Sequence, residues 1–174
     1  AESKESKSQS NKTDKDSEKA VNKISDRILK DIHKYETVKE LSEQLFKNFS
    51  KEFHIVQALV FIKNKSNKKF QIADTYAFFS EEKINDFEEG EGINGQVAKD
   101  KTVKLLTDIS EGYITVLSGL GSSSPKNLLL IPLVHNNETI ALIELASFHD
   151  FPSSYKKIYK RINKPVSDKY KSLL

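Results

Sequence analysis

The spacing of apolar residues predicts a helical first third of the chain. From Ala20 onward, apolar residues recur at steps of three and four, which places them on one helix face. These residues are Val21, Ile24, Ile28, Ile32, Tyr35, Val38, Leu41, Leu45, Phe49 and Phe53. The pattern predicts a long amphipathic helix with a break near Tyr35. Its first half has the narrow seam of a coiled coil, whereas Phe46 widens the second half into a face that suits packing on a sheet.

Apolar, β-branched segments further along predict an antiparallel sheet. The expected strands are Ile55 to Ile62, Phe70 to Phe79, Val103 to Leu106, Leu128 to His135 and Thr139 to Phe148. The last two are joined at Asn136-Asn137, residues that tolerate the positive φ of a tight turn. In the second strand, strict alternation would place four aromatic and aliphatic side chains on one face: Phe70, Ile72, Tyr76 and Phe78.

The order of these elements predicts an α+β fold. A glycine-rich turn leads into a short helix over 93–99, and a long polar loop covers 112–127. A final helix begins after Phe151-Pro152, and we expect a kink or break before Pro165. Antiparallel strands with helices at both ends of the chain indicate a central sheet with the N- and C-terminal helices packed on one face.

Length and composition divide the chain into a domain and an appendage. A chain of 174 residues has room for one ordinary domain, and 37% hydrophobic residues suffice for a core. Because alanine is the only hydrophobic residue type before Val21, we predict a disordered polar tether over 1–19. Residues 20–34 would form a helical stalk that meets another chain, and residues 35–174 the domain itself.

Composition also removes several classes of chemistry. The absence of cysteine excludes a disulfide scaffold, a thiol nucleophile, an iron–sulfur cluster and a cysteine-based zinc site. No apolar run is long enough to span a bilayer, and no signal peptide is evident. We expect a cytoplasmic segment of a longer protein; a membrane anchor in that protein and an extracytoplasmic location both stay open. The basic stretch from Tyr155 to Leu174 is typical of a solvated helix face, so nucleic acid is not an expected partner.

A glycine motif matches the dinucleotide-binding fingerprint, but the residues before it do not fit that fold. Residues Gly90 to Gly95 match G-x-G-x-x-G, which uses its glycines to bring a pyrophosphate to a helix N-terminus. However, Phe87-Glu88-Glu89 is not the apolar strand that should precede the motif, and the glutamates would repel phosphate. The motif instead predicts a turn that needs positive φ or a close backbone approach.

The same segment resembles a known family. Glu89 to Ala98, followed by Val103 to Asp108, is similar to the central signature of GAF domains, the small-molecule sensory modules of many bacterial signalling proteins. Asn127 to Leu133 and Ile140 to Ala146 resemble the last hairpin of that family. The resemblance spans about 35–165 and implies helices on one face of an antiparallel sheet and a pocket on the other, roofed by loops around 87–127. It also implies terminal helices that pair in a homodimer and transmit a signal.

Residues that other members of the family use for chemistry are missing. The pattern of the cyclic-nucleotide binders is absent from Ala146 to Pro152, and members that depend on cysteine are excluded. His54, His135 and His149 form no pair at helical spacing, which favours surface histidines over haem or metal ligands. Ser122-Ser123-Ser124 lacks a nucleophile elbow and a base. We therefore predict a non-enzymatic domain with no catalytic residue, no cofactor and no metal.

A small-molecule pocket under the 112–127 loop is the remaining candidate site. It would combine apolar walls with a few hydrogen-bond donors, as ligand pockets do. The predicted ligand-binding residues are Phe61, Tyr76, Phe78, Tyr113, Ser118, Leu120, Ser122, Lys126 and Asn127. Lys126 would pair with a carboxylate or phosphate, and Tyr113 would cover the ligand and donate its hydroxyl. In the alternative, Phe78, Phe79 and Leu120 fill the pocket, and the domain is a ligand-free scaffold for dimerisation and signal relay.

Overall fold

A five-stranded antiparallel sheet forms the centre of the molecule. The computed structural model describes residues 2–78, 83–109, 116–118 and 121–174. The strands follow the order β2-β1-β7-β6-β3 across the sheet. Their bounds are β1 Ile55–Lys63, β2 Phe70–Tyr76, β3 Lys104–Leu106, β6 Asn127–His135 and β7 Glu138–Ser147. The β6–β7 hairpin turns at Asn136 and Asn137, whose φ values of 47° and 61° agree with the predicted tight turn.

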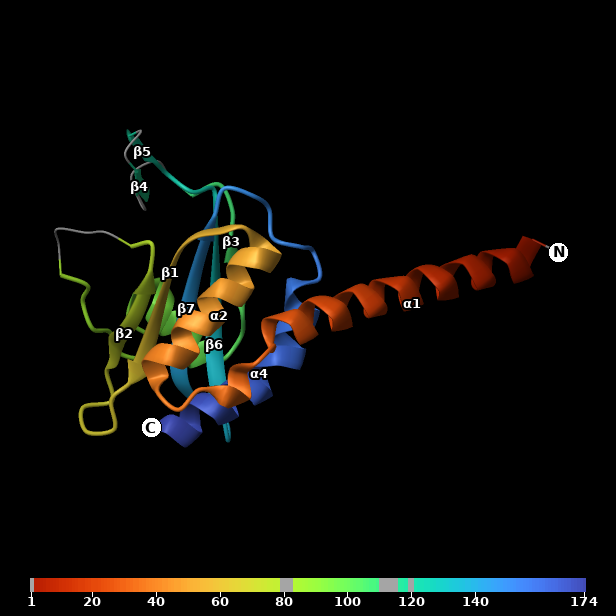
Figure 1. Ribbon diagram of the computed structural model, residues 1–174. Coiled ribbons are helices and arrows are strands. Elements are labelled where there is room, and N and C mark those ends of the chain that lie inside the picture. Colours follow the sequence, from red (N-terminus) through yellow and green to blue (C-terminus); the bar gives the residue numbers. More distant parts are fainter. Residues whose placement is uncertain (1, 79–82, 110–115, 119–120) are drawn as a thin grey trace.

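Three helices lie on one side of this sheet; two of them pack on the strands, and the third packs on those two (Figure 1). They are α1 Glu2–Ile28, α2 Val38–Phe53 and α4 Tyr155–Leu173, and a 3-10 turn over Ile32–Lys34 links the first two. Buried side chains of the helices and of the facing strand positions form one continuous core. The expected α+β architecture with both terminal helices on one face is confirmed.

The start of α2 shows how the sequence sets the expected break. Thr37 caps the helix because its Oγ1 accepts a hydrogen bond from the Glu40 backbone N–H at 3.2 Å. The Glu40 carboxylate in turn accepts one from the Glu36 backbone N–H at 3.3 Å. This reciprocal arrangement satisfies backbone donors that the first helical turn leaves free. It begins a new helix close to the predicted break at Tyr35.

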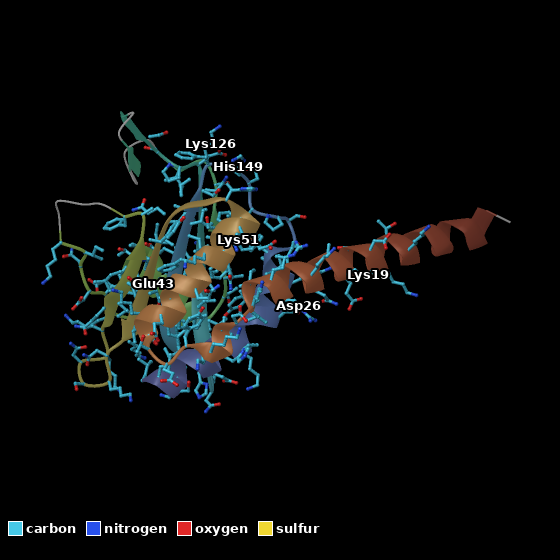
Figure 2. All side chains as sticks on the ribbon, viewed as in Figure 1. Lys19, Asp26, Glu43, Lys51, Lys126 and His149 are labelled. Atoms are coloured by element: carbon cyan, nitrogen blue, oxygen red, sulfur yellow. The ribbon has the colours of Figure 1, made fainter. Side chains whose placement is uncertain are left out.

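The N-terminal segment differs from the expected tether and stalk. Residues 12–20 are helical and exposed, and α1 projects well beyond the domain with charged side chains such as Lys19 along it (Figures 1 and 2). Val21 and Ile28 are only 4% and 0% exposed and belong to the core formed with α2 and α4. The seam that we expected to meet another chain is therefore buried against the chain's own helices, because α4 supplies the apolar partner.

α4 runs without interruption through Pro165, where a kink or break was expected. Proline removes the hydrogen bond that its N–H would make to the carbonyl of Arg161. Both residues are exposed. Water can therefore solvate the free carbonyl, while Ile162 and Val166 hold the helix to the core.

The opposite face of the sheet carries a second, smaller core under α3 Gly92–Asp100. α3 is fixed to the sheet by Thr139 of β7, whose Oγ1 donates a hydrogen bond to the Ala98 carbonyl at 2.6 Å. Val97 and Ala98 are buried beside it. Within the predicted 112–127 loop, two short strands, β4 Val116–Ser118 and β5 Gly121–Ser123, form a hairpin beyond the end of the sheet (Figure 1).

A bulge in β2 overturns the predicted alternation of that strand. Val60 pairs with Asp74 and Phe61 with Ile72, so Ala73 has no partner on β1. A one-residue insertion moves the following side chains to the other face. Phe70 and Ile72 belong to the smaller core, whereas Tyr76 packs into the helix-side core.

None of the helices within the described residues has the length and apolar character needed to cross a membrane.

Candidate functional site

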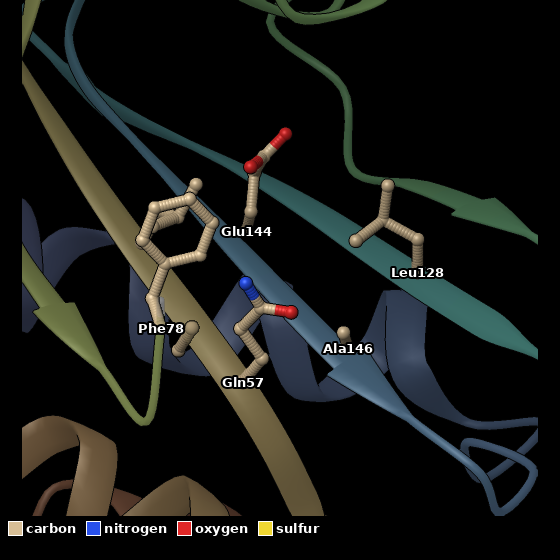
Figure 3. A pocket seen from close by; sticks show the side chains of 7 residues that line it. Gln57, Phe78, Leu128, Glu144 and Ala146 are labelled. Carbon is tan, nitrogen blue, oxygen red and sulfur yellow. The ribbon is translucent and has the colours of Figure 1, made fainter. Parts of the chain in front are cut away.

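A cavity of ≈ 60 Å³ lies on the sheet face opposite the three large helices. Most of its wall is apolar, and the strands contribute two polar side chains. The lining residues are Gln57, Ala58, Leu59, Phe78, Leu128, Glu144 and Ala146. Figure 3 shows the Gln57 amide and the Glu144 carboxyl group between Phe78 on one side and Leu128 on the other.

Gln57 contributes a buried and unpaired acceptor to this cavity. It lies on β1 and is 5% exposed. Its Oε1 has no hydrogen-bond partner among the described residues. A buried carbonyl without a partner costs about 1–3 kcal/mol, so native proteins seldom keep one. Its presence on a cavity wall points to a partner outside the described residues.

Glu144 is the second polar group in the cavity. It lies on β7 between Leu59 of β1 and Leu130 of β6, its cross-strand neighbours. Burial raises the pKa of its carboxyl group above the ordinary 4.5, and a hydrogen bond from the Asn94 side chain opposes this rise. Asn94 belongs to the first turn of α3, so α3 positions a side chain that stabilises the charged form.

The described part of the cavity wall carries few reactive side chains. Its residues include no serine, histidine or lysine that could act as a nucleophile or base. Among the described residues no three histidine or carboxylate side chains come together to hold a metal ion. An apolar concavity with a few convergent polar groups is the usual form of a small-molecule site.

Comparison with known proteins yields structural neighbours and no sequence relatives. No protein-family model matches the chain, and no curated protein does. Among solved structures, a GAF domain from a Coxiella burnetii phosphoenolpyruvate-protein phosphotransferase superposes with a TM-score of 0.69. The sequences are 14% identical, and the match covers 87% of this chain and 93% of that one.

The chain has the fold of a GAF domain.

Two further neighbours show the range of proteins that share this GAF fold. A free methionine-R-sulfoxide reductase from Neisseria meningitidis, solved with its substrate, has a TM-score of 0.68 and 11% identity over 88% of this chain and 89% of that one. The GAF domain of a two-component sensor histidine kinase from Bacillus halodurans has a TM-score of 0.61 and 8% identity over 80% and 97%. At these identities the likeness establishes the fold.

The sheet residues predicted for the GAF pocket fall in three different places. Phe78 lines the cavity. Phe61 is buried on the same face, where its ring packs edge-on against Phe87 at 5.0 Å between centroids. Tyr76 lies on the opposite face, with its ring centroid 6.2 Å from that of Phe46, because the bulge at Ala73 shifts its side chain to the other face of the sheet.

The loop residues predicted for the site are only partly described. Tyr113 and Leu120 lie outside the described residues. Ser118 and Ser122 belong to the paired strands of the β4–β5 hairpin. Lys126 is exposed and is absent from the wall of the cavity.

Asn127 has a structural role in this fold. It is 3% exposed, and its Nδ2 donates hydrogen bonds to the His149 carbonyl at 2.9 Å and to Asp150 Oδ1 at 3.2 Å. These bonds hold the connection between β7 and α4 against the start of β6.

Sequence reasoning missed Gln57 and Glu144. Each is a polar residue inside a strand that is otherwise apolar, and that contrast was the available signal. A polar side chain within a buried strand needs a partner, so such positions are candidates for a site.

We expect Asn127→Ala to lower the free energy of unfolding by about 1–3 kcal/mol, because it leaves the His149 carbonyl and the Asp150 carboxylate without their donor. Urea denaturation measures this change. Lys126→Ala, one residue earlier and exposed, is the matched control and should stay within about 0.5 kcal/mol of the wild type. Equal stability of the two variants would contradict the structural role.

Proposed function

We propose that this GAF domain is a non-enzymatic regulatory module that binds a small molecule in the cavity lined by Gln57, Glu144 and Phe78. The observation that carries the proposal is the unpaired, buried Oε1 of Gln57 at a cavity wall. The fold supports it, since neighbours include domains of a sensor histidine kinase and of a phosphotransferase. The lack of cysteine separates the chain from thiol-dependent enzymes.

The strands that form the cavity also carry the helices. On β1, Gln57 and Leu59 face the cavity side, whereas Ala58 and Val60 belong to the helix-side core. On β7, Ile143 and Leu145 pack toward the helices while Glu144 faces the cavity. A ligand that binds one arrangement of these strands better shifts the population toward it, and the helices respond. In the full protein, we propose that the exposed surfaces of α1 and α4 meet those of a second copy in a homodimer and pass this change along the chain.

The small volume of the cavity favours a second function, that of a ligand-free scaffold. The cavity of ≈ 60 Å³ is small beside typical ligand pockets of about 300–1,000 Å³. A domain whose pocket stays closed would act as a ligand-free scaffold for dimerisation and signal relay.

A thermal-unfolding screen of refolded, ligand-stripped protein separates the two. The panel comprises nucleotides, amino acids, organic acids, amines, aromatic metabolites and haem. A ligand at 100 times its Kd should raise Tm by roughly 5–10 °C for a chain of this length. No shift across the panel would favour the scaffold.

The Gln57→Leu variant tests whether a ligand found in this screen binds in the cavity. We expect this variant to raise the stability of the ligand-free domain by about 1 kcal/mol, because it removes an unpaired buried carbonyl, and to abolish the ligand-induced shift. Gln96→Leu, on the exposed side of α3, is the control and should keep the shift. A shift that survives in Gln57→Leu would place the ligand elsewhere.

A further inference from the structure

The charge of the cavity wall restricts the ligand. Gln57 Oε1 and the Glu144 carboxylate are acceptors, the Gln57 Nε2 group is the one amide donor of the described wall, and the remaining described wall residues are apolar. No lysine, arginine or histidine lines the cavity among the described residues. A carboxylate or phosphate ligand would therefore meet Glu144 without a compensating cation, which is costly at a buried position.

A group that donates hydrogen bonds and carries positive charge has the complementary properties. An ammonium group has three N–H donors and no acceptor, so it can satisfy the Gln57 carbonyl and the Glu144 carboxylate together. Figure 3 shows the Gln57 amide and the Glu144 carboxyl group on the same wall, between the Phe78 ring and the Leu128 side chain. The apolar side chains suit a short hydrocarbon portion of the ligand.

We propose that the cavity binds a compact primary amine, with its ammonium group between Glu144 and Gln57 Oε1 and its hydrocarbon part against Phe78 and Leu128. This inference rests on the proposed sensory function and adds the ligand class to it. The volume of ≈ 60 Å³ sets the size at a few heavy atoms within these walls.

Protonation of Glu144 makes the interaction depend on pH. Burial raises the pKa of this carboxyl above 4.5. The groups packed around it are Gln57 and Leu59 from β1, Leu128 and Leu130 from β6 and Asn94 from α3; none of these titrates. The ionised form binds an ammonium group and the neutral form loses that attraction. Amine affinity should therefore fall as the pH is lowered through the pKa of Glu144.

Three probes of one shape test the ligand class: 3-methylbutylamine, 3-methylbutanol and 3-methylbutanoate, titrated into the full chain and followed by amide NMR shifts. We expect the amine to bind at least about tenfold more tightly than the alcohol, with the carboxylate weakest. Shifts should centre on β1 and β7 around Gln57 and Glu144.

Glu144→Gln tests the residue. It keeps the shape of the side chain and removes its charge, so it should weaken the amine at least about tenfold, leave the alcohol unchanged and abolish the pH dependence. Glu43→Gln is the matched control, because Glu43 lies exposed on α2 on the helical side of the sheet (Figure 2). It should change none of these values.

Each other result overturns the amine proposal. Equal affinity for amine and alcohol, tighter binding of the carboxylate, or no binding of any probe would each do so. If the wider thermal screen still finds a ligand that Gln57→Leu abolishes, the sensory function stands and only the ligand class is wrong. If that screen is also empty, both proposals fall.

Discussion

Gly95→Ala is expected to destabilise the domain by at least about 2 kcal/mol, with a fall in Tm of roughly 4–8 °C. A Cβ at this position would collide with the backbone carbonyl oxygen of Glu88 and lie 3.1 Å from the Gly90 nitrogen. These are main-chain atoms of a tight turn, in which the Gly90 N–H donates to the Gly95 carbonyl at 2.7 Å. The turn cannot move away without breaking that bond.

Gly92→Ala in the same turn is the matched variant. Gly92 has a φ of +63° and nothing within 4 Å of an added Cβ, so alanine would meet backbone strain without a collision. The left-handed conformation costs a non-glycine residue about 1–2 kcal/mol. Chemical denaturation gives the free energy of unfolding of both variants, and thus compares the collision at Gly95 with the backbone strain at Gly92. A Gly95→Ala variant no less stable than Gly92→Ala would show that the turn yields to the methyl group.

This turn also links the glycine motif to the site. Gly95 follows Asn94, the residue whose side chain hydrogen-bonds to Glu144. A displaced turn would move the start of α3 and remove that hydrogen bond. We therefore expect Gly95→Ala to weaken ligand binding as well as folding. The sequence pattern predicted the close backbone approach at this motif, although not the carboxyl group that it serves.

Elements with a strong local signal were predictable from sequence. The β6–β7 hairpin combines two apolar runs with two asparagines that accept positive φ, and α2 combines an amphipathic face with the Thr37 cap. Local signals of this kind set the type of each element before any tertiary contact forms. The fold class followed from the order of these elements along the chain.

The side of the sheet on which a residue lies was less predictable. The bulge at Ala73 depends on how β2 pairs with β1, and nothing in the Phe70 to Tyr76 segment itself marks it. One unpaired residue moved Tyr76 from the expected pocket to the helix-side core. The packing of the predicted stalk was hard to predict for a similar reason: Val21 and Ile28 join a core with α2 and with α4, and α4 lies more than a hundred residues away in sequence.

The second large effect is expected at Tyr170, which fixes α4 to α2. Its side chain is completely buried, and its hydroxyl lies 2.7 Å from Ser42 Oγ. Ser42 Oγ donates to the Val38 carbonyl at 2.7 Å, so the Tyr170 hydroxyl is the donor of the pair. Burial raises the pKa of Tyr170 well above the ordinary 10, so the hydroxyl stays a donor even at alkaline pH.

Tyr170→Ala should lower the free energy of unfolding by about 3–5 kcal/mol, the usual cost of removing a buried aromatic side chain. Tyr170→Phe keeps the ring and loses only the hydroxyl, so about 1 kcal/mol is expected. Urea denaturation measures both. Because domains have only about 5–15 kcal/mol of stability, the alanine variant should be close to unfolding, and the phenylalanine variant is the informative one for function.

Tyr170→Phe also tests whether the helices respond to the cavity. If ligand binding shifts α4, a variant with a looser α2–α4 contact should show a changed ligand-induced response while binding stays within about twofold, since Tyr170 lies on the opposite face from Glu144. The response is read from amide NMR shifts in α4 upon addition of the ligand. α4 shifts identical to those of the wild type would show that this hydrogen bond takes no part in transmission, and the apolar contacts between the strands and the helices would then carry it.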